Sequence, residues 1–480
     1  MTAGSNLYGL FAAAAAQAGE SPAFIENKEV RLRYDALDAA VAGWADALRR
    51  CGARPGDRIL VQAEKSVENA LLYLASLRAG LVYVPLNTAY TPAEVAWFVA
   101  DAEPVLVVDD ARLDEMAAGI VPGAEADIVP RAPDDLAAIL YTSGTTGRSK
   151  GAMLSHDNLA SNALVLKDYW RWRPGDVLIH ALPIYHVHGL FVALHGALLD
   201  GSSMLWHKAF DAGAVIEDLA RATILMGVPT FYVRLAADPR LTREAAANMR
   251  LFVSGSAPLL ESTFADFEAK TGHRILERYG MTEAGMICSN PYDGPRIPGT
   301  VGFPLPGVAA RVADSEGREV ARGEPGTLEI KGPNLFKGYW RQPGKTAEEM
   351  RADGSFITGD VATMDADGRV SIVGRAKDLI IAGGLNIYPK EIELAIDAVP
   401  GVGESAVIGV PHSDLGEAVV AIIVRTDPAL DEAAIIAGIA DLARFKQPRR
   451  ILFADALPRN AMGKVQKAAL REAHRHLFAD

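Results

Sequence analysis

The chain has 480 residues, half of them hydrophobic, so it can bury large cores and should form more than one domain. Its net charge of −12 argues against general nucleic-acid binding and against docking on an anionic membrane. Only Cys51 and Cys288 occur, too few for a disulfide framework or a cysteine zinc site, and this favours a reducing cytoplasm.

The N-terminal third alternates helical and strand patterns. Its first apolar stretch, at 7–16, has no Lys or Arg before it, so an ordinary helix is expected there and not a signal peptide. No uninterrupted apolar run reaches the length of a membrane span. We predict helices at 34–50, 67–80 and 92–101, and strands at 58–62, 82–86 and 105–108. This alternation predicts parallel sheets covered by helices.

A segment rich in glycine and hydroxyls follows the predicted buried strand at 136–141. It reads Tyr-Thr-Ser-Gly-Thr-Thr-Gly-Arg-Ser-Lys-Gly, residues 141–151. Glycines permit tight bends, and successive N–H groups, hydroxyls and Lys150 suit a polyphosphate. No Gly-Lys-Ser/Thr follows the first glycine at the distance that a Walker loop requires. The residues therefore indicate either a phosphate loop of another class or a polar surface loop.

Strands that end in glycine-rich turns continue beyond this loop. Strands are predicted at 176–182, 222–228, 251–258 (entering a turn) and 274–279, and helices at 156–169, from Thr230, and at 262–271. Such turns at the carboxyl edge of a doubly wound sheet are common ligand sites. The two histidines of 183–189 have no third ligand at a metal-like spacing, so we expect them to line a pocket or a core.

The pattern changes near residue 294. Short apolar alternations at 327–331, 356–360 and 368–374 predict a small β-rich unit. A boundary is expected after Arg375, followed by an α+β region. That region should contain strands at 378–382, 406–410, 418–424 and 450–453, and helices at 389–398, 431–443 and 465–477.

Six segments together carry a family resemblance. Besides the loop at 141–151 they are 254–259 (Ser-Gly-Ser-Ala-Pro-Leu), 278–283 (Arg-Tyr-Gly-Met-Thr-Glu), 357–360 (Ile-Thr-Gly-Asp), 374–378 (Gly-Arg-Ala-Lys-Asp) and 458–464 (Pro-Arg-Asn-Ala-Met-Gly-Lys). In order and spacing they resemble the AMP-forming acyl-CoA synthetases of the adenylate-forming superfamily, over nearly the whole chain. The resemblance implies an α/β fold. Residues 1–375 would form a large domain of two doubly wound sheets with a β-barrel-like unit, and residues 376–480 a small mobile α+β domain.

The resemblance also implies a reaction and a set of site residues. ATP would activate a carboxylate as acyl-AMP, and CoA would then displace AMP. Thr282 would contact the α-phosphate, Glu283 would bind Mg²⁺, a hard cation, and Lys464 would bridge the carboxylate and the α-phosphate. Residues implied to hold the phosphates of ATP are Thr142, Ser143, Gly144, Thr145, Thr146, Gly147 and Lys150. Those implied to form the adenine slot are Gly255, Ala257, Pro258 and Tyr279. Asp360 would accept hydrogen bonds from the ribose, and Arg375 would support the ribose or a phosphate. Lys377 matches the hinge, and Gly383, Gly384 and Lys446 would contact CoA.

Two arginines bear on which acid is used. In an extended segment Arg278 and Tyr279 point to opposite sides, so Arg278 can face the acyl site if Tyr279 faces adenine. Salt bridges to neighbours such as Glu277 are the alternative. The segments 185–189, 228–232 and 277–283 most resemble malonyl-CoA synthetases, in which two arginines hold the free carboxylate. This resemblance implies a malonate or methylmalonate ligase with Arg234, Arg278 and His188 at that carboxylate.

Three other functions compete with this one. They are a ligase for another short-chain or aromatic acid, an adenylation module that loads a carrier protein, and a non-catalytic binding protein. No carrier-like segment with an acceptor serine occurs in the sequence, and Glu283, Asp360 and Lys464 are all present, which weakens the last two. The expected partners are ATP, the carboxylate and CoA, with no nucleic acid or membrane, and the expected state is a monomer.

Overall fold

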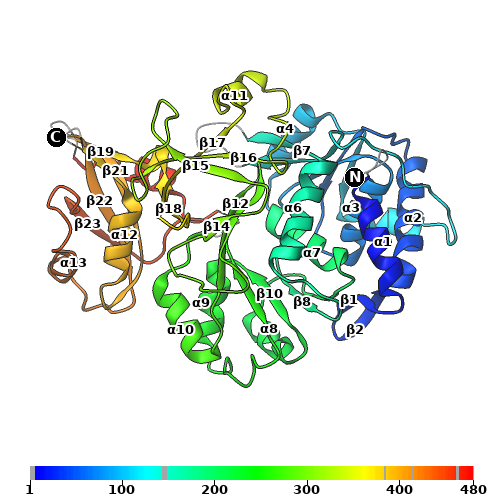
Figure 1. Ribbon diagram of the computed structural model, residues 1–480, viewed down its shortest axis with the longest axis horizontal. Helices are drawn as coiled ribbons and strands as arrows, with labels where there is room; N and C mark the ends of the chain where they lie inside the picture. Colours follow the sequence, from blue (N-terminus) through cyan, green and yellow to red (C-terminus); the bar gives the residue numbers. More distant parts are fainter. Residues whose placement is uncertain (1–5, 143–148, 383–384, 413–414, 461–463, 479–480) are drawn as a thin grey trace. The chain divides into compact units, whose positions relative to one another are not determined.

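The computed structural model describes residues 6–142, 149–382, 385–412, 415–460 and 464–478. They form two compact units, shown with their elements in Figure 1. The first unit comprises Met1–Ala309 and Lys331–Phe356, and the second Ala310–Ile330 and Ile357–Asp480. By their contacts, residues 357–375 thus belong with the C-terminal part of the chain. The predicted boundary between a large domain at 1–375 and a small mobile domain at 376–480 stays a prediction.

A five-stranded sheet in the first unit carries the glycine-rich loop. Its order is β5 (Leu106–Asp109), β3 (Arg58–Gln62), β4 (Val82–Pro85), β6 (Leu136–Thr142) and β7 (Lys150–Ser155). The first four are parallel, and β7 returns antiparallel to β6. The connections contain α3 (Val67–Arg78) and α4 (Pro92–Ala102), and α2 (Tyr34–Arg50) precedes β3. The predicted alternation of helices and parallel strands is therefore confirmed.

A nine-stranded sheet forms the rest of that unit's framework. Its order is β14 (Phe303–Pro304), β13 (Gly285–Ser289), β12 (Leu276–Met281), β11 (Leu251–Ser254), β10 (Ile224–Gly227), β8 (Val177–His180), β9 (Ser203–Trp206), β1 (Pro22–Glu26) and β2 (Glu29–Arg33). The strands from β12 to β1 run parallel. Antiparallel pairs close both edges, and their strands β1, β2, β13 and β14 were not predicted.

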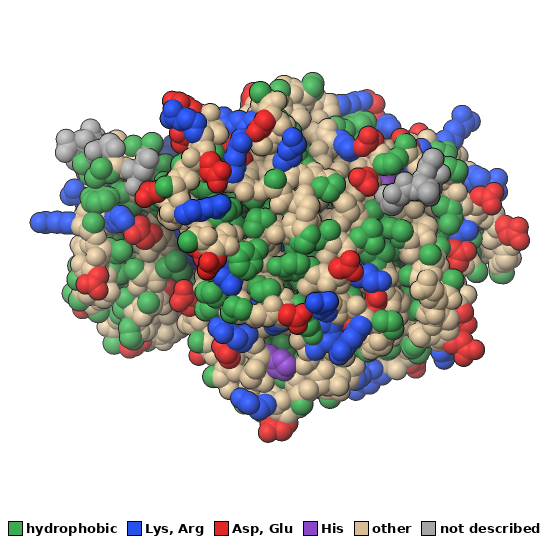
Figure 2. Space-filling model, viewed as in Figure 1, with side chains coloured by type: hydrophobic (Ala, Val, Ile, Leu, Met, Phe, Trp, Pro, Cys, Tyr) green, Lys and Arg blue, Asp and Glu red, His purple; other side chains and the backbone are tan. Residues whose placement is uncertain are grey.

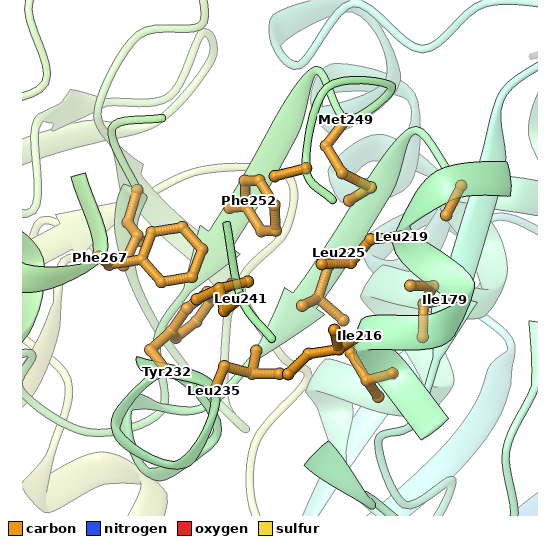
Figure 3. Close-up of a cluster of buried hydrophobic side chains, with 14 of the residues drawn as sticks. Ile179, Ile216, Leu219, Leu225, Tyr232, Leu235, Leu241, Met249, Phe252 and Phe267 are labelled. Carbon is orange, nitrogen blue, oxygen red and sulfur yellow. The ribbon is translucent and has the colours of Figure 1, made fainter. Parts of the chain in front are cut away.

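A buried apolar cluster fixes the central strands of this sheet (Figure 3). Tyr232, from α9 (Pro229–Ala237), points into it beside Phe252 and Phe267. The Tyr232 hydroxyl donates a 2.6 Å hydrogen bond to the Val253 carbonyl. That bond satisfies the polar atom of an otherwise apolar side chain. Helix α9 is therefore anchored to β11, the strand that leads into the Gly255 turn.

The second unit contains two small sheets. The first has the order β15 (Ala309–Ala313), β16 (Gly326–Lys331), β17 (Phe356–Met364) and β18 (Val370–Arg375). In the other, β20 (Leu385–Ile387), β19 (Ile380–Ala382), β22 (Gly416–Arg425) and β21 (Val402–His412) are neighbours in that order, and β23 (Arg450–Ala454) pairs with β22. Helix α12 (Pro389–Asp397) contacts β21.

Two predicted helices of this unit were too long. The helix predicted at 431–443 is α13 (Glu432–Gly438), and it ends at a glycine, a poor helix former. The closing helix predicted at 465–477 is α14 (Lys467–His474). Residues 465 and 466 are not helical because Val465 pairs with Arg459 in a β-bridge.

Two further features concern the charges on the surface and the apolar character of the helices. On the face shown in Figure 2, basic and acidic side chains are interspersed. Across the described residues, no helix combines the length and the apolar character that a membrane crossing needs.

Candidate active site

The β6–β7 pair holds the two ends of the glycine-rich loop together. Thr142 and Lys150 are register partners, and the Thr142 hydroxyl donates to the Lys150 carbonyl at 3.3 Å. The backbone of Lys150 is therefore held beside Thr142. Five of the predicted phosphate contacts lie outside the described residues: Ser143, Gly144, Thr145, Thr146 and Gly147.

Lys150 is the first member of a chain of polar contacts. Its Nζ donates to Glu349 Oε1 at 3.0 Å and lies 4.1 Å from the centroid of the Tyr339 ring. The Tyr339 hydroxyl lies 2.6 Å from Glu349 Oε2 and 2.9 Å from Glu283 Oε1. The loop lysine and the predicted metal ligand are thus joined through two residues that the sequence analysis missed. Neither Tyr339 nor Glu349 belongs to a motif that we recognised.

Thr282 and Glu283 occupy the tight turn between β12 and β13. The Ala284 amide donates to Met281 across the turn, and Gly285 has a φ of +59°, which a residue with a Cβ adopts only with strain. Glu283 is 6% exposed, and its carbonyl accepts from the Phe336 amide at 2.8 Å. Thr282 faces a cavity of about 10 Å³ beside Phe191. The turn therefore holds both side chains rigidly.

The turn after β11 contains the predicted adenine contacts. Gly255 is buried, Ala257 half-buried and Pro258 exposed. Ser256 has a φ of +72°, so the chain reverses sharply there. Tyr279, on the neighbouring β12, is half-buried. These four contacts lie at the carboxyl ends of adjacent parallel strands, where doubly wound sheets bind ligands.

Arg278 is a buried cation. It is 3% exposed, and neither its Nε nor its Nη2 has a hydrogen-bond partner among the described residues. Its guanidinium fits against Gly255, where an added Cβ would lie 2.6 Å from Arg278 Cζ. Burial lowers the pKa of Arg278 to about 9, so it stays charged at neutral pH. Uncompensated buried cations are costly, so this one indicates a site for an anion.

His188 contributes to the same region. It is 3% exposed, and its Nδ1 lies 3.4 Å from the Ser256 hydroxyl. Burial, followed by the nearby charge of Arg278, holds the pKa of His188 well below its usual value. The imidazole is therefore neutral at pH 7 and adds a polar group without a second charge.

Arg234 has a different environment. It lies on α9, and its side chain is exposed, whereas Tyr232 on the same helix faces the core. The structure thus brings Arg278 and His188 together. The part expected of Arg234 stays a prediction.

Two of the predicted ATP or AMP contacts meet in the second unit. Asp360 and Arg375 are register partners on β17 and β18, and Arg375 Nε lies 2.7 Å from Asp360 Oδ1. Asp360 is 3% exposed. The ion pair therefore ties the Asp360 carboxylate on β17 to β18.

The remaining predicted residues of that unit have separate surroundings. Lys464 is exposed, and its amide donates to Asn460 Oδ1 at 3.0 Å. Lys377 is exposed by surface area, yet partial desolvation, followed by the charge of Arg375, lowers its pKa to about 8. Lys446 donates to both oxygens of Glu391, at 2.6 and 2.8 Å. Gly383 and Gly384 lie outside the described residues.

Comparisons with known proteins identify the fold that carries these residues. The AMP-binding enzyme family matches residues 11–340, and the C-terminal domain of AMP-binding enzymes matches 391–464. The chain belongs to this family. Within it, the protein is an adenylate-forming CoA ligase, a class that takes ATP, a carboxylate and CoA as substrates.

Several relatives of this CoA ligase are similar over nearly their full length. Feruloyl-CoA synthase from Amycolatopsis sp. is 36% identical over 465 residues, which cover 92% of this chain and 93% of that protein. Malonate–CoA ligase from Arabidopsis thaliana is 35% identical, covering 88% and 79%. The crystal structure of ATP-bound MatB from Rhodopseudomonas palustris is 52% identical with a TM-score of 0.94, covering 98% and 99%.

Proposed function

We propose that this CoA ligase activates malonate, or its methyl derivative, to malonyl-AMP and then to malonyl-CoA. The observation that carries the proposal is the buried Arg278 guanidinium, whose Nε and Nη2 have no partner among the described residues. Malonate keeps one carboxylate that does not react, and that group must leave water to enter the enzyme. A preformed cation offsets this desolvation, whereas an acid with an apolar or neutral tail has no use for one.

Two further observations support an acid with a compact charged end. His188 is neutral, so beside Arg278 it would add a hydrogen-bonding group and not a further positive charge. Gly255 permits the close approach of Arg278 to the turn that follows β11, where the adenine contacts are predicted. The malonate–CoA ligase of Arabidopsis thaliana is among the similar proteins, although a feruloyl-CoA synthase is equally similar in sequence.

The proposed chemistry has two steps. A carboxylate oxygen attacks the α-phosphorus of ATP, and the bond to the β-phosphate breaks to release pyrophosphate. The CoA thiol then loses its proton and attacks the acyl carbon, and AMP leaves. We assign Thr282 and Lys464 to the α-phosphate, Lys150 to the departing phosphates and Asp360 to the ribose. Oriented cations and donors of this kind stabilise the charge of the first step.

Mg²⁺ fits the donors around Glu283. A buried carboxylate that a tyrosine hydroxyl also contacts, together with phosphate oxygens from ATP, is an oxygen-only set of the kind that Mg²⁺ takes. When bound, the ion would neutralise charge on the phosphates. We also propose Lys377 as the hinge of the small domain, and Gly383, Gly384 and Lys446 as CoA contacts.

The test is a panel of acids assayed for release of AMP that depends on ATP, CoA and Mg²⁺. Malonate, methylmalonate, butyrate and ferulate separate the candidates, because they differ in charge and bulk at the end that does not react. Malonate or methylmalonate should have the highest kcat/KM. A preference for butyrate or ferulate would leave the ligase assignment intact and refute the dicarboxylate.

A further inference from the structure

Glu349 lies in the phosphate region without a part in the reaction described above. It follows α11 (Pro343–Glu348) in the first unit, and its side chain is 23% exposed. Its Oε1 accepts from Lys150 at 3.0 Å and lies 3.5 Å from Lys345 Nζ, and its Oε2 lies 2.6 Å from the Tyr339 hydroxyl. Partial burial opposes ionisation, but the hydrogen bonds from Tyr339 and Lys150 hold the pKa of Glu349 below its usual value. Glu349 is therefore an anion at neutral pH.

An anion at this position opposes the binding of a triphosphate. It repels the incoming phosphates, and it occupies the ammonium group that those phosphates need. The Tyr339 hydroxyl lies within hydrogen-bond distance of both Glu349 and Glu283. It has one hydrogen, so it can donate to only one of the two carboxylates at a time. A tyrosine hydroxyl keeps its hydrogen at neutral pH, because its ordinary pKa is about 10.

Lys150 can leave Glu349 without losing its direction. Lysine is a point charge on a flexible stem with three donors, so it can exchange one anion for another. The Tyr339 ring, 4.1 Å from Nζ, attracts the ammonium whichever anion it binds. The backbone of Lys150 stays paired with Thr142 throughout.

We propose that Glu349 is a positioning residue, an internal counter-ion that holds the Lys150 ammonium over the Tyr339 ring until the phosphates of ATP displace it. The inference rests on the proposed contact between Lys150 and the phosphates. It is independent of which acid the enzyme uses. It predicts that the carboxylate lowers the affinity for ATP while keeping the lysine in place.

The experiment measures ATP binding by calorimetry with Mg²⁺ and without acid or CoA. Glu349→Gln keeps the shape and the hydrogen-bond acceptor but removes the charge. Half-exposed ion pairs of this kind are worth little, so the dissociation constant for ATP should fall about two- to fivefold. Binding of AMP, which lacks the β- and γ-phosphates, should be unchanged. A fold-change for ATP alone would not arise from a general effect on stability.

Glu348→Gln is the matched control. It makes the same change in net charge one residue away, at a side chain that is 67% exposed and that pairs at 2.8 Å with Lys345, a lysine that also lies 3.5 Å from Glu349 Oε1. ATP should bind this variant as it binds the wild type. If Glu348→Gln tightens binding as much as Glu349→Gln, the effect is one of net charge, and the counter-ion is refuted.

Lys150→Met completes a double-mutant cycle. Lys150→Met alone should weaken ATP binding. When Glu349→Gln is added to the Lys150→Met variant, it should tighten ATP binding clearly less than it does in the wild type. If Lys150→Met weakens binding while Glu349→Gln has no effect or weakens it too, the inference alone is overturned. If Lys150→Met leaves ATP binding unchanged, both the phosphate contact of Lys150 and the counter-ion are overturned. The acid panel stays a separate test of malonate.

Discussion

Two cations of the first unit differ in how they are held. Arg278 is 3% exposed, with two guanidinium nitrogens that have no partner among the described residues. Lys150 has a 19% exposed side chain, a carboxylate at 3.0 Å and an aromatic ring beneath it. An arginine in a dry, rigid site recognises a planar carboxylate, whereas a partly hydrated lysine exchanges anions readily. The difference matches a selective site for the acid and a reversible site for phosphates.

The same difference has opposite consequences for the empty enzyme. A buried charge without a counter-ion destabilises the fold that contains it. The pair of Lys150 with Glu349 avoids this cost, but a ligand must then displace the counter-ion. Arg278 would thus provide selectivity for the acid and lower the stability of the empty enzyme. Glu349 would let Lys150 exchange anions and lower the affinity for ATP. The predictions that follow test this contrast.

Arg278→Met should have the largest effect. Removing one member of a buried charge pair costs roughly 3–5 kcal/mol, on the order of a hundred- to several-thousand-fold in kcat/KM for malonate. Butyrate should lose far less, or gain, because it brings no second charge. The free variant should also melt at a higher temperature than the wild type, since the unpaired cation is gone. Equal losses for both acids, with no gain in melting temperature, would contradict the contrast.

Gly255→Ala should displace the same guanidinium without removing it. The new Cβ would lie 2.6 Å from Arg278 Cζ, so the charged group must move. A shift of about 1 Å at a binding group can cost up to ~10²-fold, so kcat/KM for malonate should fall by roughly ten- to a hundredfold. Gly344→Ala is the control, because an added Cβ there meets no atom within 4 Å. Malonate kinetics that are alike in the two variants would show that Arg278 adapts freely.

These two substitutions also show what the sequence could predict. Arg278 drew attention because it stands next to Tyr279 on a strand, where alternation sends the two side chains to opposite faces, and its part in binding the acid stays a prediction. The doubly wound sheets were predictable from the rhythm of apolar runs. Glu349 and Tyr339 were not, because they meet Glu283 and Lys150 only through the fold. Glu349 is 199 residues from Lys150, and no local pattern records that contact.

A buried histidine behaves differently from the buried Arg278. Histidine is the weaker base, so burial leaves it neutral at pH 7, whereas Arg278 stays charged. His195, in α7 (Leu194–Leu199), is fully buried beside Tyr73, and burial lowers its pKa to about 3. Between that value and about 6.5 the unfolded chain binds a proton that the folded chain does not, so stability falls by about 1.4 kcal/mol per pH unit on acidification. His195→Gln should flatten the slope of unfolding free energy against pH in that window. An unchanged slope would show that His195 does not carry the effect.

Arg234→Met should have the smallest effect of the four. Its side chain is exposed, so it keeps most of its hydration, and a charge in water interacts weakly with a carboxylate at short range. The loss of kcat/KM for malonate should be at most about fivefold, in the same direction as for Arg278→Met, and butyrate should be unaffected.

Salt provides the second measurement. An exposed cation is screened, so the difference between wild type and Arg234→Met should shrink as ionic strength rises. The loss caused by Arg278→Met should persist, because a buried charge is screened much less. Arg234→Met could instead lower kcat/KM for malonate as much as Arg278→Met does, with no reduction of the loss by salt. That result would show that both arginines enclose the carboxylate when the acid binds, and that exposure in the free enzyme does not predict their roles.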